Sequence, residues 1–240
     1  MRLSLIERNG GLSVAWDVVV APQSAFEALR ERPQWVWAFA LTCALGMVGA
    51  ILEIPAGAHV AAATIADQAA HDPTMAVLSP DRIAAMTRYQ VSTQRWFWLG
   101  WPLVVLTATS LATLLMLAFD RLTRGSASFA KLFALAMNVA ILNYGIGFLV
   151  IGVLCALRSP EDFSAPSDIA RLTPSLAWFA PAASPKVTAF FVGFNPFQFW
   201  SFVLLALGLR TIAGFAPAGS YIVAAAVVLA GLLFPVLVAR

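Results

Sequence analysis

The feature that most constrains this chain is a series of apolar runs, each long enough to cross a lipid bilayer. A hydrocarbon core about 30 Å thick is crossed by roughly 20 helical residues at about 1.5 Å each. Five runs reach this length, at about residues 35–54, 97–119, 132–157, 196–214 and 221–239. The sequence therefore predicts an all-α fold, an integral membrane bundle of five transmembrane helices.

Charged residues and prolines mark the ends of the first three runs. The first carries a single acid, Glu53, just before Pro55. The second stops at Asp120, and the third is uncharged between Lys131 and Arg158. These boundaries leave two long loops, residues 55–96 and 158–195, which we expect to be partly helical. In the first of them, residues 79–81 (Ser-Pro-Asp) are typical of a helix start.

The fourth run contains a basic residue before its end. Asn195 followed by Pro196 is typical of an N-cap and a first-turn proline, so we expect a helix to begin there. To reach membrane length near Gly214 this helix must include Arg210. We expect the long Arg210 side chain to extend toward the headgroups.

Composition supports the membrane class and excludes others. Hydrophobic residues make up 60% of the 240 and charged residues only 11%, against roughly 45–50% and about 25% in soluble domains. A water-soluble globule and a disordered chain are both excluded. The basic residues occur singly at the edges of apolar runs, so the expected partner is the lipid bilayer and not nucleic acid.

The basic residues also predict an orientation, because loops rich in Lys and Arg stay in the cytoplasm. Eight lie on one predicted side and seven on the other: Arg2, Arg8, Arg30, Arg32, Arg121, Arg124, Lys131 and Arg210 against Arg82, Arg88, Arg95, Arg158, Arg171, Lys186 and Arg240. The first group is denser and flanks the short loops. This density favours a cytoplasmic N-terminus and a C-terminus outside.

The 34 residues before the first run form a short cytoplasmic N-terminal segment, ahead of a membrane domain at residues 35–240. Residues 1–11 lack the apolar run and cleavage site of a signal peptide, so we expect no cleaved targeting segment. Residues 22–30 place Phe26 and Leu29 on one helical face, with Glu27 and Arg30 elsewhere. Such a helix can lie on the cytoplasmic leaflet or pack against its own bundle.

Motifs for catalysis or metal binding are weak. His59 and His71 lie twelve residues apart, a spacing that matches no zinc pattern, so we interpret them as solvated loop residues. Ser128 and Lys131 have the Ser-x-x-Lys spacing of some nucleophiles, but without the partner motifs of that class. We interpret Ser128, with Ser126, as a cap of the third span. The sequence predicts no catalytic residue, no cofactor and no metal, and hence no enzyme.

Polar residues at membrane depth are the better indicators of a site, since such groups are costly unless paired or facing a cavity. Glu53, Asn195 and Gln198 fall at one depth near the outer face, where they form a possible polar site or simply face outside water. Asn138 and Asn143 project from different faces of the third span, so we interpret them as interhelical hydrogen-bonding residues.

Small residues indicate how the first span packs. Four of them recur at every fourth position along this span: Ala38, Thr42, Gly46 and Ala50. Such a ladder lets a neighbouring helix backbone approach closely.

Residues 195–209 read NPFQFWSFVLLALGL, with an aromatic start, Trp200 and then Leu-Leu-x-x-Gly-Leu. This stretch resembles the closing motif of the Yip (Ypt-interacting-protein) domain family. Two earlier features are also similar to that family: Pro22 with Phe26 and Leu29 before the first span, and residues 125–129 (Gly-Ser-Ala-Ser-Phe) before the third. The resemblance implies five spans, a cytosolic N-terminus and a C-terminus on the far side.

Eukaryotic members of this family are associated with Rab GTPases and vesicle traffic through a long cytosolic N-terminal region. This chain has only about 34 residues there, so GTPase binding is not expected. The Ala-rich composition and the short N-terminal segment resemble bacterial members. The resemblance thus implies a protein of the bacterial cytoplasmic (inner) membrane, and it supplies no catalytic residues.

Two functions remain open from the sequence. The first is a non-enzymatic membrane adaptor that binds other membrane proteins, which predicts a tight bundle without a continuous polar path. The second is a small transporter or lipid-handling protein, with Glu53, Asn195 and Gln198 lining an outer site. The almost wholly apolar middle of the second, fourth and fifth runs favours the adaptor.

Overall fold

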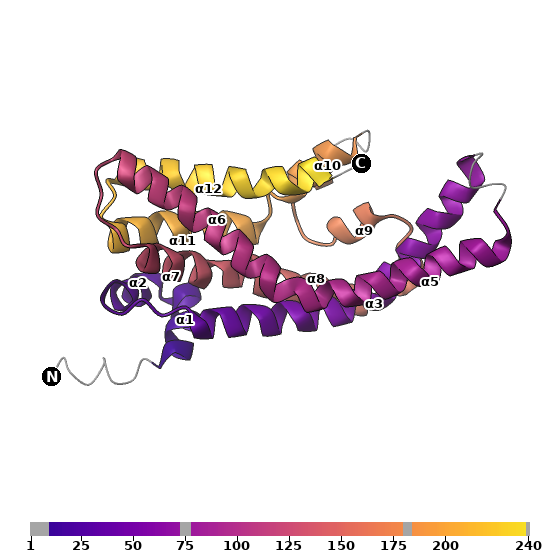
Figure 1. The fold of residues 1–240 in the computed structure, drawn as a ribbon, viewed down its shortest axis with the longest axis horizontal. Helices are drawn as coiled ribbons and strands as arrows, with labels where there is room; N and C mark the ends of the chain where they lie inside the picture. The colour runs from indigo at the N-terminus through magenta and orange to yellow at the C-terminus, as the bar shows by residue number, and fades with distance from the viewer. Residues whose placement is uncertain (1–9, 73–77, 180–183, 239–240) are drawn as a thin grey trace.

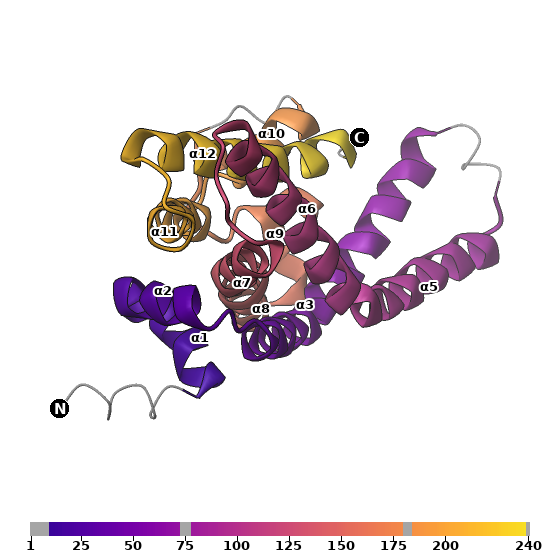
Figure 2. The same cartoon turned by 60° about the vertical axis from the view of Figure 1, so that its left-hand side comes forward.

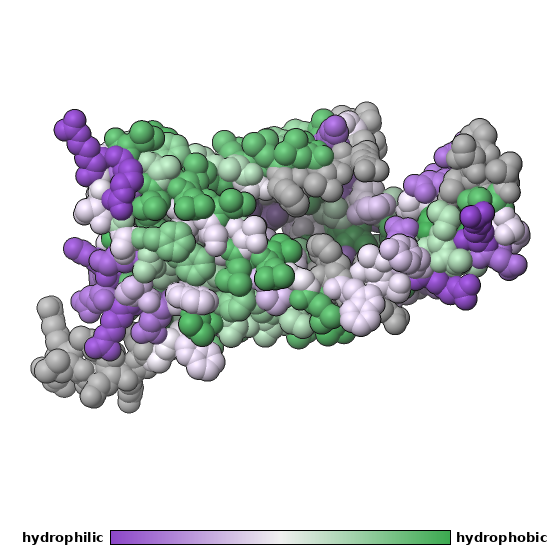
Figure 3. Space-filling model, in the orientation of Figure 1, coloured by the Kyte–Doolittle hydropathy of each residue, from purple (hydrophilic) through white to green (hydrophobic). Residues whose placement is uncertain are grey.

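A computed structural model describes residues 10–72, 78–179 and 184–238. Within these ranges the regular structure is entirely helical, which confirms the all-α prediction (Figure 1). Four of the described helical segments are long and apolar enough to cross a membrane: Val36–His71, Trp101–Leu122, Phe129–Ala156 and Pro196–Ala213. They lie side by side, so that apolar residues cover the middle of the body and polar residues gather toward its ends (Figure 3).

The first span is longer than the sequence predicted. Helix α3, Val36–His71, continues as one 36-residue helix through Pro55, where we expected the run to end after residue 54. A proline inside a helix removes one backbone hydrogen bond and costs about 3 kcal/mol. Burial offsets this cost, because Ala56 and Val60 pack with Phe163 and Leu172, which lie between the third and fourth spans.

The second half of α3 and helix α5, Pro80–Phe97, form a hairpin that extends beyond the rest of the bundle (Figure 2). The helix start predicted at residues 79–81 is confirmed. His59 and His71 therefore lie on α3 and not in a loop, and His71 pairs with Asp67 at 3.1 Å. A short 3-10 turn, η1 (Trp98–Gly100), leads into α6, Trp101–Leu122.

The third span has three parts in one continuous helix: α7, Phe129–Ala140; the π-helical η2, Ile141–Gly147; and α8, Phe148–Ala156. Ser128 caps α7 by accepting a hydrogen bond from the backbone N–H of Lys131, as the sequence predicted. The segment that follows contains four described short helices: η3 (Pro160–Asp162), α9 (Pro166–Ala170), η4 (Leu176–Trp178) and α10 (Pro185–Val192).

Helix α11, Pro196–Ala213, begins and ends where the sequence predicted. Asn195 is its N-cap, and Gly214 ends it in the left-handed conformation with φ of 72°, which glycine adopts without steric cost. Helix α12 then runs from Pro217 to Val238. It begins four residues before the predicted run at 221–239, whose last residue lies outside the described ranges.

The N-terminal segment packs against its own bundle. Helices α1 (Gly11–Val20) and α2 (Pro22–Glu31) contact each other, and α2 lies against α11 and α7. Phe26 and Leu29 are fully buried in the main hydrophobic cluster, together with Leu132 and Leu204. Residues 22–30 thus form a helix whose apolar face packs against its own bundle. Residues 1–9 lie outside the described ranges.

Helix α3 makes its most extensive contact with α8 and η2. The four residues of the small-residue ladder of α3 are buried, and a Cβ on Gly46 would come within 2.6 Å of the Tyr144 carbonyl oxygen of η2, which confirms the predicted close approach. Gly49 and Gly152 lie backbone to backbone: a Cβ on Gly49 would come within 2.8 Å of the Leu149 Cα, and one on Gly152 would meet the backbone of Gly49. Only glycine fits at these two positions.

Candidate functional site

Two of the three residues of the predicted outer site lie together. Asn195 accepts a hydrogen bond at its Oδ1 from the backbone N–H of Gln198 (2.9 Å) and donates from Nδ2 to the carbonyl of Val192 (3.1 Å). The Oδ1 of Asn195 therefore caps α11, and its Nδ2 is bonded to the end of α10. The Gln198 side chain lies one turn further along the same helix and is half-buried.

The third residue, Glu53, lies on α3 next to α8. Its side chain is half-buried. Among the described residues it forms no hydrogen bond or ion pair, and none joins it to Asn195 or Gln198. The structure thus brings Asn195 and Gln198 together but does not join them to Glu53.

The two asparagines of the third span hold chain segments together, as the sequence predicted. Asn143 donates from Nδ2 to the hydroxyl of Ser201 on α11 at 3.0 Å. Asn138 donates from Nδ2 to the carbonyl of Gln34, which precedes α3, at 2.8 Å, and to its own helix at Ala134. Both amides therefore fasten α7–η2 to its neighbours, a role that suits a packed bundle.

Buried hydroxyls inside the bundle are satisfied within their own helices. Thr42 donates to the carbonyl of Ala38, and Thr113 to that of Thr109, both at 2.7 Å. Thr109 donates in turn to Val105 at 2.7 Å. Because these hydroxyls are used locally, they do not present free hydrogen-bonding groups to a transported solute.

Sequence reasoning missed a basic pocket of about 360 Å³ at the end of the bundle where α7 begins and α11 ends. Three cations from three different helices line it: Arg30 of α2, Lys131 of α7 and Arg210 of α11. The α6–α7 connection contributes Ser126 and Ser128. The sequence contained one signal of this pocket, because all three cations were assigned to the same predicted side of the membrane.

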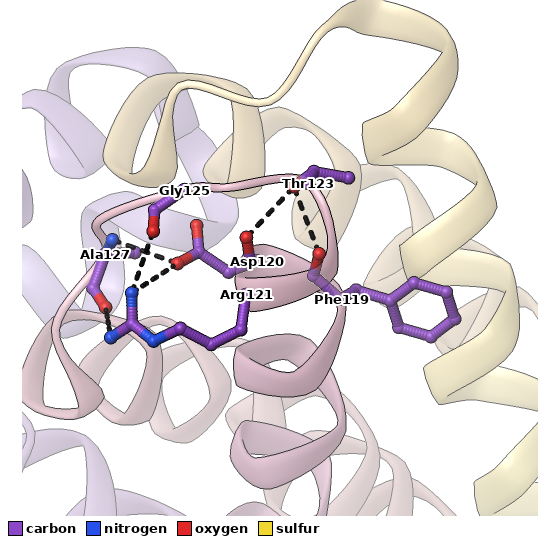
Figure 4. Close-up of polar contacts among 6 residues, drawn as sticks. All are labelled: Phe119, Asp120, Arg121, Thr123, Gly125 and Ala127. Atoms are coloured by element: carbon purple, nitrogen blue, oxygen red, sulfur yellow. Dashed lines mark hydrogen bonds and ion pairs between the residues drawn. The ribbon is translucent and has the colours of Figure 1, made fainter.

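The α6–α7 connection beside this pocket is held by a buried carboxylate (Figure 4). Asp120 is 1% exposed and accepts hydrogen bonds from the Ala127 N–H (3.1 Å) and the Arg121 guanidinium (3.2 Å). Arg121 also donates to the carbonyls of Gly125 (2.8 Å) and Ala127 (3.1 Å). A Cβ on Gly125 would run into the Asp120 carboxylate, so this position requires glycine.

The basic side chains at this end of the bundle differ in whether they have partners within the chain. Arg121 is engaged with Asp120 and the loop carbonyls. Arg30, Lys131 and Arg210 form no ion pair with a described residue, and the first and last of them are exposed. The pocket therefore brings together three positive charges, none of which is ion-paired with a described residue.

Long apolar helices with an apolar exterior over the middle of the body define a multi-pass integral membrane protein (Figure 3). Residues 16–239 match the family model described as the Yip1 domain, and the chain therefore belongs to the Yip1 domain family. The resemblance carried by residues 22–29, 125–129 and 195–209 is confirmed.

One bacterial relative is similar over nearly the whole chain. It is a Bacillus subtilis (strain 168) protein described as "Membrane protein YknW", which is 23% identical over 233 residues. The similar region covers 95% of this chain and 91% of the relative. No solved structure matches the chain.

Proposed function

We propose that this protein is a non-enzymatic adaptor of the bacterial cytoplasmic membrane, which binds other membrane proteins through its spans. The observation that carries the proposal is the closed interior: α3 and α8 touch backbone to backbone at Gly49 and Gly152. The hydroxyl and amide side chains described above within the spans, such as Thr42 and Asn143, are hydrogen-bonded inside the bundle. Large apolar side chains instead face outward, such as Leu103, Leu111 and Leu114 of α6. An outward apolar surface and a packed interior suit helix-to-helix binding better than solute passage.

The proposal includes the membrane topology: five spans, with the N-terminus in the cytoplasm and the C-terminus outside. Helix α12, Pro217–Val238, has 22 residues and is therefore about 33 Å long, enough to be the fifth span. The basic residues assigned to the cytoplasm also gather at one end of the bundle, with Arg30, Lys131 and Arg210 around one pocket. Such clustering supports the orientation through the positive-inside rule.

Reporter fusions test the topology. We expect a cytoplasmic reporter to be active when fused after Ser126 and inactive when fused after Arg240, with the opposite pattern for a periplasmic or extracellular reporter. Two reporters on the same side of the membrane would contradict five spans.

Extraction of the full chain in native lipid discs, followed by mass spectrometry, tests the adaptor role. We expect at least one membrane protein to accompany it at a fixed stoichiometry across preparations. An unrelated multi-span protein with the same tag, prepared in parallel, is the control for adventitious capture. A chain that emerges without a protein partner but with one enriched small molecule would contradict the adaptor and support a transport or lipid-handling role.

Glu53 supports the second candidate, a transporter or lipid-handling protein with an outer polar site. A half-buried carboxylate without a described hydrogen-bonding partner costs stability, and such groups in membrane spans usually serve function. We expect Glu53→Gln, which removes only the charge, to raise the midpoint of thermal unfolding by a few degrees, equivalent to about 1 kcal/mol. The exposed Glu27→Gln is the matched control and should change nothing. A lower midpoint for Glu53→Gln would reveal a stabilising partner and remove this argument.

A further inference from the structure

We propose that the basic pocket binds the phosphate of an anionic phospholipid from the surrounding leaflet. Three cations reach this pocket from three separate helices, through Arg30, Lys131 and Arg210. Like charges gathered in one place repel one another unless an anion lies between them. Because no described acidic residue pairs with any of the three, the structure leaves room for an external anion.

The groups around the three cations suit a phosphate. The hydroxyl-bearing residues Ser126 and Ser128 line the pocket, and Ser128 is the N-cap of the 12-residue helix α7. The positive end of the α7 dipole therefore points to the same place as the cations. Arginine donors, hydroxyl groups and a helix N-terminus are the usual components of phosphate sites. The volume of about 360 Å³ lies within the range of about 300–1,000 Å³ typical of small-ligand pockets.

Position in the fold points to a lipid as the source of the phosphate. The pocket lies where α7 begins and α11 ends, and both helices belong to segments long and apolar enough to cross a membrane. This places the pocket at the level of the headgroups. Three apolar residues, Ala127, Ile212 and Ala213, also line the pocket and suit the first methylenes of a lipid. A free phosphate would gain nothing from these apolar side chains.

The pocket is also held in shape before any ligand arrives. The backbone N–H of Ala127 donates to the buried Asp120 carboxylate, and Arg121 donates to the Ala127 carbonyl. Both bonds fix the connection that carries Ser126 and Ser128. Ligand binding at such a site does not have to order the loop, and this raises affinity.

Native mass spectrometry of the full-length protein tests the proposal. The protein is released from detergent containing equal amounts of phosphatidylglycerol and phosphatidylcholine, and bound lipids are counted. We expect one phosphatidylglycerol to be retained in preference to phosphatidylcholine. The variant Arg30→Gln/Arg210→Gln should weaken this binding about tenfold or more, whereas Arg30→Lys/Arg210→Lys should keep most of it.

The matched control is Arg32→Gln/Arg124→Gln, which removes the same charge from two exposed residues outside the pocket lining. It should reduce lipid binding less than about threefold. Equal losses in both double variants, or no preference for phosphatidylglycerol in the unchanged protein, would overturn the pocket. A thermal unfolding scan of each variant shows whether it is folded, and Lys131→Gln provides a second, single-charge test of the same lining.

Competition identifies the source of the phosphate. Excess inorganic phosphate, compared with sodium chloride at equal ionic strength, should not displace the phosphatidylglycerol. Displacement by inorganic phosphate alone would show that the pocket binds free phosphate, and would overturn its assignment to a lipid.

Discussion

Replacing Gly49 by alanine is expected to destabilise the protein by about 3 kcal/mol, because no atom fits between α3 and α8 at this position. The added Cβ would lie 2.6 Å from the Phe148 carbonyl carbon and 2.8 Å from the Leu149 Cα. Both are backbone atoms, so no rotation of a side chain relieves the contact. The two helices must move apart, and the buried ladder of small residues along α3 loses contact with its neighbour.

A second glycine is the control for this effect. A Cβ on Gly231 of α12 would meet nothing within 4 Å, so Gly231→Ala should be neutral or slightly stabilising through helix propensity. The measurement is the midpoint of thermal unfolding of the purified protein in detergent. Equal midpoints for Gly49→Ala and Gly231→Ala would show that α3 and α8 do not approach as closely as described.

Replacing Asp120 by alanine is expected to cost about 3 kcal/mol, since it removes the acceptor that holds the α6–α7 connection. The N–H of Ala127, a buried residue, loses its bond to the carboxylate, and Arg121 loses its ion pair. The connection that lines the basic pocket is then free to move. We therefore expect Asp120→Ala to lower both the unfolding midpoint and the retention of phosphatidylglycerol.

An exposed ion pair provides the comparison for Asp120. Asp67 and His71 are 75% and 77% exposed, so Asp67→Ala should change stability by less than about 1 kcal/mol. Asp120→Asn keeps an oxygen acceptor for Ala127 and should fall between the two. If Asp120→Ala unfolds at the same temperature as Asp67→Ala, the hydrogen bonds of the Asp120 carboxylate do not stabilise the bundle.

Local signals predicted helix boundaries wherever the reason for the boundary was itself local. Asn195, Ser128 and the Ser-Pro-Asp start at residues 79–81 all lie where helices begin, because capping satisfies backbone groups within one turn. Pro55 misled the same reasoning. Its cost to the helix is local, but the burial that offsets the cost comes from Phe163 and Leu172, more than a hundred residues away.

The candidate sites also show the difference between local signals, which the sequence contains, and contacts between distant segments, which it does not. Counting residues along each predicted span led us to expect Glu53, Asn195 and Gln198 at one depth along the bilayer normal. Depth does not determine which faces of two helices meet, and the structure joins only Asn195 and Gln198. The basic pocket was missed for the same reason, since residues 30, 131 and 210 become neighbours only when α2, α7 and α11 pack together.

The sequence by itself determined the all-helical membrane class, the places of the apolar runs and the Yip1 family relationship. These properties follow from how favourably each segment partitions into lipid and from short motifs. Both depend on neighbouring residues in the sequence, so they are contained in each stretch of the chain by itself. Only the tertiary structure decided that α3 continues past Pro55, that α2 packs against the bundle and that three cations share one pocket. Those outcomes depend on contacts between distant segments, whose free energies no single stretch of sequence contains.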